Sequence, residues 1–266
     1  AAALGHDNIT AVTADCREFI KSTDKHYDIV FIDPARRGTN GERIYRLTDC
    51  SPDVTSMLDD IAAVADRLIL KASPMLDITQ VLRELPHTTD IYVTGTSTEC
   101  KEIVADVIFD NKHTSEPVIH VMTPLYDFSF TQSEEASATP DYDLPVAGEY
   151  LYEPGAAVMK AAPFKLLSQR YGLKKLHPNT HLYHSAARIA DFPGETWRID
   201  RVADFSSHEI KAISRQYDRL NIATRNFDMP ADTLRKKLKV KDGGTQRLIA
   251  ATLADNSKAM LLLSTP

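Results

Sequence analysis

The sequence has few cysteines, and none of them lies close to another. Cys16, Cys50 and Cys100 are spread through 266 residues, and no C-x-x-C motif occurs. A disulfide framework or a zinc finger uses cysteines in closely spaced sets, so the sequence predicts neither. An odd and sparse set of thiols is typical of a reducing compartment, and we expect the protein to be cytoplasmic.

Long hydrophobic runs and sorting signals are also missing. No apolar run approaches the roughly 20 residues that a membrane-spanning helix needs. The first eight residues, AAALGHDN, lack the basic and apolar regions of a signal peptide. Hydrophobic residues make up 43% and charged residues 26% of the chain, as in an ordinary globular protein. We therefore expect no membrane partner and two or three globular units.

Acidic and basic residues are unevenly distributed. Residues 1–150 contain 12 lysines and arginines against 26 aspartates and glutamates, whereas residues 151–266 contain 19 against 11. The basic second half is the better candidate for contact with phosphate groups. A solvated charged surface would give the same imbalance, so charge alone leaves both interpretations open.

Strand and helix patterns alternate over the first 110 residues. Strands are predicted at 8–15, 27–33 and 67–73, helices at 16–22, 51–66 and 75–85, and two further strands within 90–110, joined near Glu99. The strand YDIVFID should be buried, because its apolar run shows no alternation. This order predicts an α/β fold with a mostly parallel sheet that is covered by helices and closed by an antiparallel hairpin.

The second half of the chain predicts smaller units of mixed structure. Residues 131–146, TQSEEASATPDYDLPV, are polar and contain two prolines, as in a loop or linker. Strands at 148–155, 180–185 and 194–202 and a helix at 163–172 follow, and they form a small β-α-β-β unit. From Asp204 a third unit opens with a capping box at Ser206 and Glu209. Its elements are helices at 208–219 and 230–240, a strand at 220–227 and a hairpin within 246–265.

Polar residues follow three of the predicted strands. Asp15-Cys16, Asp33-Pro34-Ala35-Arg36 and Lys71-Ala72-Ser73-Pro74 stand at the carboxyl ends of strands, where ligands gather in open α/β sheets. The loop after Asp33 contains four arginines, Arg36, Arg37, Arg43 and Arg46. A carboxylate beside arginines can orient a substrate amine while the arginines hold phosphates. The alternative is structural, with Asp33 capping a helix or pairing with Arg36 and Arg37.

The stretch ALGHDNITAVTADCREFI…YDIVFIDPARRG resembles the middle of a class I S-adenosylmethionine-dependent methyltransferase. The resemblance implies S-adenosylmethionine as the cofactor. It places Asp15 beside the adenine, with the Cys16 backbone close by. It also implies that Asp33 and Pro34 line the methyl-transfer site and that Arg36 faces the substrate.

Further motifs extend this resemblance over nearly the whole chain. DPARRG, ECKE, YLYEPGAAVMKA, GLKKLHPNTHLY, IATRNF and LRKKLKVKDGG together are similar to bacterial methyltransferase-like proteins with a C-terminal THUMP-like domain. The resemblance implies a partial Rossmann-like methyltransferase sheet followed by small α+β domains. The implied parts are a methyltransferase section at 1–125, a loop or linker at 126–146, a ferredoxin-like domain at 147–203 and a THUMP-like domain at 204–266.

Two departures from the family pattern affect the expected chemistry. Ala35 replaces the usual second proline, and Arg36 replaces an aromatic residue that stacks on the target base in amino-methylating relatives. A guanidinium group can also stack on a base. No G-x-G motif occurs, and the first glycine is Gly5. We therefore expect the first strands of the methyltransferase sheet to be missing from this sequence, and residues 1–266 alone to bind the cofactor poorly. Dimerisation is one way to pair the open sheet edge.

Basic residues near the end of the chain are candidates for nucleic-acid binding. The predicted set consists of Arg37, Arg225, Arg235, Lys236, Lys237, Lys239 and Lys241. On a helix, Arg235 and Lys239 would share one face. THUMP domains bind RNA, so the resemblance implies RNA as the partner, whereas the composition alone fits a solvated helix face equally well.

Three histidines, at positions 177, 181 and 184, raise the question of a metal. In a strand, His181 and His184 point to opposite faces, and no cysteine lies nearby, so we predict no metal site. The sequence thus predicts an S-adenosylmethionine-dependent methyltransferase-like protein acting on RNA. The alternative is a non-catalytic RNA-binding or adaptor protein that uses a methyltransferase-like scaffold.

Overall fold

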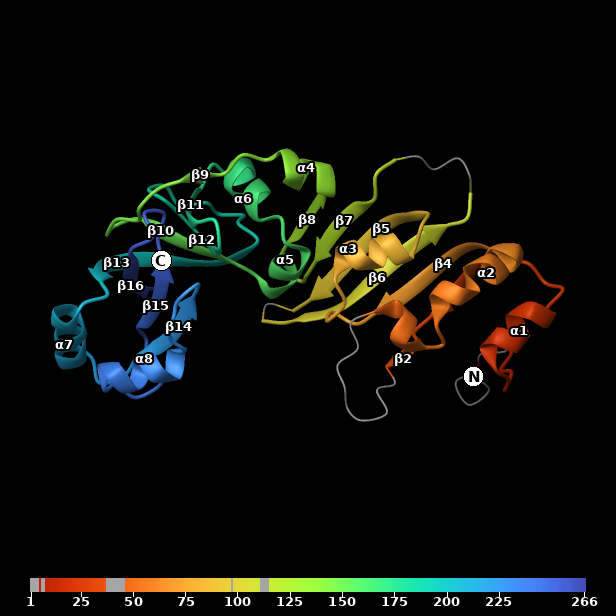
Figure 1. Ribbon diagram of the computed structural model, residues 1–266, viewed down its shortest axis with the longest axis horizontal. Helices are drawn as coiled ribbons and strands as arrows, with labels where there is room; N and C mark the ends of the chain where they lie inside the picture. Colours follow the sequence, from red (N-terminus) through yellow and green to blue (C-terminus); the bar gives the residue numbers. More distant parts are fainter. Residues whose placement is uncertain (1–4, 6–7, 37–45, 97, 111–114) are drawn as a thin grey trace. The chain divides into compact units, whose positions relative to one another are not determined.

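The computed structural model describes residues 5, 8–36, 46–96, 98–110 and 115–266. The chain forms two compact units, and both combine strands with helices (Figure 1). Unit 1 comprises residues 1–92 and 102–117, and unit 2 comprises residues 93–101 and 118–266. The α/β class predicted from the sequence is confirmed, but the sheets are mixed and not mostly parallel.

Unit 1 is built around strands in the order β1-β4-β6-β5, of which β5 and β6 belong to it for most of their length. β1 and β4 are parallel, whereas β4 and β6 are antiparallel. The bounds are α1 Cys16–Ser22, β1 Tyr27–Ile32, α2 Leu58–Val64, β4 Ala65–Ala72, α3 Ile78–Glu84, β5 Thr88–Gly95 and β6 Cys100–Ile108. From α1 onward, these elements confirm the predicted alternation, including the turn near Glu99 between the last two strands.

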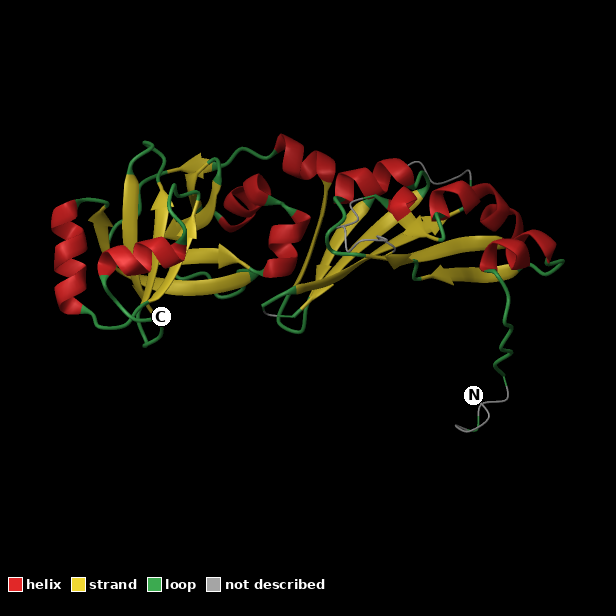
Figure 2. Cartoon of the chain, turned by 60° about the horizontal axis from the view of Figure 1, so that its bottom comes forward, coloured by secondary structure: helices red, strands yellow, loops and turns green. Residues whose placement is uncertain are grey.

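Helices cover one face of the unit 1 sheet, as Figure 2 shows. Paired residues of neighbouring strands point to the same side of a sheet. Leu68 pairs with Val107 and Leu70 with Ala105, and all four side chains are fully buried. Ile61 of α2 is buried against this side as well. Burying a leucine of this kind contributes about 1.5–3 kcal/mol, so this face forms the core of unit 1.

The other face of the sheet is open at β1. Ile29 is 49% exposed and Phe31 is 61% exposed, so the prediction of a buried strand was wrong. Within the described residues β1 stands at the end of the strand order and pairs with β4 alone. An unbroken apolar run predicts a strand correctly, but burial also requires a neighbour on each side.

The strand predicted at residues 8–15 is not formed. Ile9 is 57% and Val12 is 61% exposed, and the stretch belongs to no ladder. A strand is held by hydrogen bonds to a neighbouring strand. In the part of the chain that the structure describes, no segment pairs with this stretch. Its last residue, Asp15, serves as the N-cap of α1.

The helix predicted to begin at Ser51 and Pro52 begins later. Ser51 instead belongs to a short strand β3, Cys50–Ser51, which pairs with β2, Ala35–Arg36. Asp53 then accepts a hydrogen bond from the Thr55 backbone N–H at 3.0 Å and caps a 3₁₀ turn that leads into α2. Pro52 therefore follows strand β3 and precedes the N-cap residue Asp53.

Unit 2 contains an eight-stranded sheet in the order β14-β15-β16-β13-β10-β12-β11-β9 and an antiparallel β7–β8 hairpin. The strand bounds are β7 Val118–Met122, β8 Asp127–Thr131, β9 Asp141–Tyr142, β10 Tyr150–Pro154, β11 Lys174–His177, β12 Thr180–Ser185, β13 Gly194–Asp204, β14 Asn221–Arg225, β15 Arg247–Thr252 and β16 Lys258–Ser264. The helix bounds are α4 Gln132–Ser137, α5 Ala156–Ala161, α6 Phe164–Tyr171, α7 Ser207–Gln216 and α8 Ala231–Leu238.

Residues 131–146 are not the loop or linker that their composition predicted. They contain α4 and β9, and β8 ends at their first residue, Thr131. Thr131 and Glu134 form a capping box, in which the Glu134 carboxylate accepts from the Thr131 backbone N–H at 2.7 Å. Glu135 accepts from the backbone N–H of Leu166 at 2.8 Å, at the start of α6. Capping residues are polar, so a short capped helix has the composition of a loop.

The central strands of unit 2 are buried on both faces. Leu248, Met260 and Leu262 pack with side chains of α7 and α8. Ile249 and Leu261, on the alternate positions, pack in a second cluster with strands β10 to β13. Two apolar layers around the same strands make this part of the chain a continuous core.

Candidate functional site

The carboxyl ends of β1 and β4 bring a charged cluster together in unit 1. The parallel register pairs Ile32 with Leu70, so the next residues, Asp33 and Lys71, lie side by side. The Lys71 Nζ donates to Asp33 Oδ2 at 2.7 Å, and Glu102 lies 3.7 Å from the same ammonium group. The hydrogen bond to Asp33 raises the pKa of Lys71 above its usual value. An aspartate, a lysine and a glutamate therefore share the strand end at which ligands gather in this kind of sheet.

Asp33 has a partner that the sequence did not suggest. The structure pairs it with Lys71, whereas the alternative pairing with Arg36 and Arg37 stays a prediction. Pro34 is buried, and the backbone of Arg36 pairs with Cys50 in the β2–β3 ladder. The role of the Arg36 side chain stays a prediction, and Arg37 lies outside the described residues.

Asp15, the predicted adenine neighbour, is the cap of α1. Its Oδ1 accepts from the Arg17 backbone N–H at 2.9 Å, and its Oδ2 accepts from the Arg17 guanidinium at 2.7 Å. The Arg17 side chain is the main reason that the pKa of Asp15 is lowered to about 2. Cys16 is exposed and free as the first residue of the helix. Among the described residues, Asp15 and Asp33 share no hydrogen-bond partner, and their joint role around a cofactor stays a prediction.

Two sequence motifs meet at a nearly buried carboxylate in unit 2. Glu153 of YLYEPG accepts from Arg225 Nε, in IATRNF, at 2.6 Å and from Arg247 at 2.8 Å. Arg247 also reaches Glu195 at 3.3 Å and lies 4.8 Å from the centre of the Trp197 ring. Only 11% of the Glu153 side chain is exposed, so the two guanidinium groups compensate a charge that is largely shielded from water. Arg225, which was predicted to bind nucleic acid, forms an ion pair with Glu153 inside the protein.

Arg235 is likewise engaged within the protein. It pairs with Asp232 on its own helix and with Asp242 at 3.0 Å. The predicted shared helix face of Arg235 and Lys239 is not formed, because α8 ends at Leu238 and Lys239 adopts the left-handed conformation with φ 56°. A residue in that conformation closes the helix and does not extend it.

The remaining lysines of the predicted set are exposed. Lys236, Lys237, Lys239 and Lys241 form what we call the α8 lysine patch. The Lys237 Nζ lies 4.9 Å from the centre of the Phe205 ring, and the Lys237 side chain is exposed. The patch has the chemistry that phosphate groups require.

The histidines form structural contacts. His177 Nδ1 accepts from the Asn179 backbone N–H at 3.0 Å and contacts the Asn226 side-chain nitrogen at 3.2 Å. Two donors at Nδ1 leave the proton on Nε2, which lies 3.3 Å from the Asn256 Oδ1. In the ranges that the structure describes, no group of three or more His, Cys, Asp or Glu residues could hold a metal ion.

His181 and His184 point to opposite faces of β12. His184 Nδ1 lies 2.7 Å from the Glu149 carboxylate. His181 stacks on Phe164 with ring centres 3.4 Å apart. Burial, with a further contribution from the charge of Lys175, lowers the pKa of His181 to about 4.

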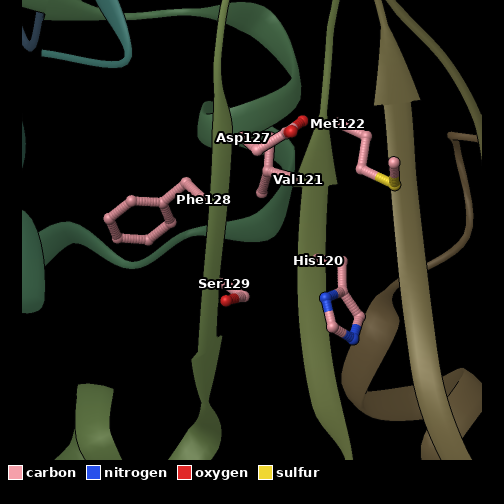
Figure 3. A pocket seen from close by; sticks show the side chains of 6 residues that line it. All are labelled: His120, Val121, Met122, Asp127, Phe128 and Ser129. Carbon is pink, nitrogen blue, oxygen red and sulfur yellow. The ribbon is translucent and has the colours of Figure 1, made fainter. Parts of the chain in front are cut away.

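A shallow hollow of about 210 Å³ lies on the β7–β8 hairpin (Figure 3). Its lining includes His120, Met122 and Phe128. In Figure 3 the side chains of His120 and Met122 point to one side and that of Phe128 points to the other. The polar residues of the lining are His120, Asp127 and Ser129, and the register places Ser129 opposite His120 and Asp127 opposite Met122.

Sequence reasoning missed several of these groups. Lys71 stood at the end of a predicted strand, but only geometry shows its contact with Asp33. Glu153 could have been noticed as an acid inside an apolar strand, since such a residue needs a buried partner. Its partners, Arg225 and Arg247, come from strands far along the chain, and their approach follows from the sheet order.

Comparisons with known proteins agree with this architecture. Residues 150–193 match the family model of a ferredoxin-like domain, and residues 194–265 match the model of a family that is THUMP domain-like. The boundary between the two matched regions lies at the start of β13, at residues 193 and 194. The sequence predicted the boundary between the ferredoxin-like and THUMP-like domains at residue 203, near the end of that strand. The comparison with curated proteins gives no match.

A solved structure is similar to almost the whole chain. It is described as a "putative methyltransferase from Porphyromonas gingivalis W83", and it is 33% identical with a TM-score of 0.83. The match covers 94% of this chain and 62% of that chain, so this chain spans less than two thirds of the relative's length.

The chain therefore matches ferredoxin-like and THUMP-like family models at its C-terminal end, and it is similar over most of its length to a structure described as a methyltransferase, as the sequence motifs predicted. The strand-end cluster lies in unit 1, and the α8 lysine patch lies in the region that matches the THUMP-like model. No helix within the described residues is long and apolar enough to cross a membrane.

Proposed function

We propose that this chain is part of a bacterial, cytoplasmic, S-adenosylmethionine-dependent methyltransferase that acts on RNA. The observation that carries the proposal is the 33% identity, over 94% of the chain, to a protein described as a methyltransferase. Activity, substrate and cofactor belong to the proposal, because the chain spans only 62% of that relative.

The strand-end cluster supplies the proposed transfer site. Methyl transfer requires a nucleophile held in line with a sulfonium group more than it requires strong acid–base chemistry. Asp33, positioned by Lys71 at 2.7 Å, can accept a hydrogen bond from an amine on the substrate. Pro34 and Arg36 follow directly and would line the acceptor side.

The described residues fit the cofactor only in part. The Asp15 carboxylate keeps lone pairs free beyond its bonds to Arg17, so it can accept from an adenine amino group. The cofactor's methionine part requires a glycine-rich turn, and the sequence contains no G-x-G motif. We therefore derive no reaction step through the cofactor.

The THUMP-like domain is the proposed RNA-binding part. The α8 lysine patch supplies charges that can neutralise phosphates, whereas Arg225 and Arg235 are held in ion pairs with Glu153 and Asp232. Binding of this kind weakens steeply as salt rises, because counterions are released when phosphates are neutralised.

The second candidate is a non-catalytic RNA-binding or adaptor protein that keeps the methyltransferase-like section as a scaffold. The missing G-x-G motif favours it. In that case the α8 lysine patch would still bind RNA, and Asp33 would have no catalytic role.

A methyl-transfer assay separates the two candidates. The complete product of the gene is incubated with labelled S-adenosylmethionine and total RNA from a strain that lacks the gene. We expect label in RNA, whereas RNA binding without label would favour the adaptor. Calorimetry on residues 1–266 is expected to show weak cofactor binding, and micromolar binding would refute that expectation.

A further inference from the structure

We propose that the strand-end cluster of Asp33, Lys71 and Glu102 is a hydroxyl-binding site, which takes the 2′-hydroxyl of a ribonucleotide in RNA. That oxygen, and not a nitrogen of a base, is then the methyl acceptor. RNA as the partner comes from the proposed function, on which this inference rests. Lys71, which no sequence motif had singled out as a site residue, thereby gains a direct contact with the substrate.

Donor and acceptor atoms lie side by side in the cluster. The Lys71 Nζ donates to Asp33 Oδ2 at 2.7 Å, and an ammonium group carries three N–H donors. Glu102 lies 3.7 Å from the same Nζ, beyond hydrogen-bonding distance. Among the described residues, no partner bonds the Asp33 Oδ1. The cluster therefore presents a free carboxylate oxygen next to free N–H donors, on side chains that are 52% and 36% exposed.

A hydroxyl group matches both kinds of atom, whereas an amino group of a base matches one. A hydroxyl can accept a hydrogen bond from Lys71 and donate one to Asp33 at the same time. An exocyclic amino group of a base has N–H donors only, so it can donate to Asp33 but offers nothing to the ammonium group. The 2′-hydroxyl is the hydroxyl that every internal nucleotide of RNA leaves free, and it both donates and accepts.

The charge of Lys71 favours the same acceptor. The hydrogen bond to Asp33, with a contribution from Glu102, raises the pKa of Lys71, so the group is an ammonium at neutral pH. A hydroxyl oxygen becomes more negative as its proton leaves, and a fixed ammonium beside it stabilises that charge. An amine nitrogen becomes positive as it bonds a methyl group, and the same ammonium opposes that charge because like charges repel.

Asp33 is the acceptor for the proton that the hydroxyl loses. When the oxygen gains a methyl group from the sulfonium donor of the proposed function, its O–H bond breaks and the proton passes to the Asp33 carboxylate. The donor's positive charge thus leaves as that proton, which Asp33 then releases to water. Glu102 remains an anion beside Lys71 and keeps the ammonium in place while Asp33 is neutral.

The position of the methyl group on RNA tests the proposal. The complete gene product is incubated with labelled S-adenosylmethionine and total RNA from a strain that lacks the gene, and the RNA is digested to nucleosides for mass spectrometry. We expect the label on a ribose 2′-oxygen. Label on a base would overturn the hydroxyl site and leave the proposed methyltransferase intact. Absence of label would contradict the proposed function, and RNA binding would then decide the hydroxyl site by itself.

A binding measurement requires no methyl transfer. RNA that the complete gene product enriches from the same total RNA is transcribed with sparse 2′-deoxynucleotides, and the substituted positions are mapped in the bound and unbound fractions. We expect at least one nucleotide at which the substitution depletes bound RNA about 10-fold, as for a lost hydrogen bond to a charged group. Lys71→Met should abolish this depletion. The matched control is Lys101→Met, which removes a lysine paired with the exposed Glu99 and should keep the depletion.

Other patterns would overturn the proposal. If Lys71→Met kept the wild-type depletion, or if no position showed depletion, the cluster would not hold a 2′-hydroxyl. An equal loss of binding at all positions in Lys71→Met would give Lys71 a structural role only. Failure of the gene product to enrich any RNA would remove the partner and the proposal together.

Discussion

β1 of unit 1 and β16 of unit 2 carry similar apolar runs and differ sharply in burial. Ile29 and Phe31 of β1 are 49% and 61% exposed, whereas Leu261 and Leu263 of β16 are fully buried. β16 lies between β15 and β13 and has an apolar cluster on each face, whereas β1 has one described neighbour. Sequence therefore specifies the strand, and the surrounding elements decide what the strand contributes to stability.

The largest expected effect lies at the Glu153 cluster of unit 2. Glu153→Ala would leave the guanidinium groups of Arg225 and Arg247 without their shared counter-ion, and should cost about 3–5 kcal/mol of unfolding free energy. Urea denaturation measures this. Glu195→Ala removes a half-exposed partner of Arg247 and should cost less than about 1 kcal/mol. Equal costs for the two variants would show that burial of the pair is unimportant.

Matched truncations in residues 1–266 test the difference in burial between β1 and β16. Leu261→Ala should cost about 2–5 kcal/mol, because it opens a cavity in a closed core. Ile29→Ala removes a half-exposed side chain and should cost less than about 1 kcal/mol. Urea denaturation of both variants under the same conditions measures the two losses of unfolding free energy. A large cost for Ile29→Ala would mean that this face is already covered.

Acidification should weaken unit 2 through His181. Burial lowers its pKa from 6.5 to about 4, so below pH 6.5 the unfolded chain binds a proton that the folded chain does not. The free energy of unfolding should therefore fall between pH 6.5 and 4, by at most about 3 kcal/mol, since one pKa unit corresponds to about 1.4 kcal/mol.

His181→Phe isolates this contribution, because a phenyl ring can keep the stacking on Phe164. Urea denaturation at several pH values should give a smaller pH slope for the variant than for the wild-type protein. Identical slopes would assign the acid sensitivity to other groups.

The smallest expected effects concern the α8 lysine patch. Lys236→Ala and Lys239→Ala should each weaken RNA binding modestly and reduce the slope of log K against log salt by about 1. Lys174→Ala is the control, because Lys174 is already paired with Asp141. Fluorescence anisotropy at several salt concentrations measures the slope. If all three variants kept the wild-type slope, the patch would not contact phosphate.

The architecture was predictable because its signals are local. The cap at Ser206, the helix end at Gly172 and the hairpin within 246–265 depend on residues close in sequence, and the structure contains all three. The capped helix α4 escaped prediction because its polar capping residues resemble a loop.

Exposure and ion pairing were not predictable in the same way. The exposure of Phe31 depends on which elements lie beside β1, and the pairing of Arg225 depends on Glu153, 72 positions away. Asp33 was identified by its place at a strand end, while its contact with Lys71 follows from the parallel register of β1 and β4. Long-range geometry of this kind leaves little trace in a single sequence.

The methyl-transfer activity of Asp33→Asn tests the central claim most directly. In the complete gene product, this variant should lower kcat/KM with S-adenosylmethionine and RNA by about 100-fold or more, while RNA affinity stays unchanged. Asp24→Asn, at an exposed position away from the strand-end cluster, should keep the wild-type value. Unchanged kcat/KM for Asp33→Asn would contradict the assignment of the methyl-transfer site to the carboxyl end of β1.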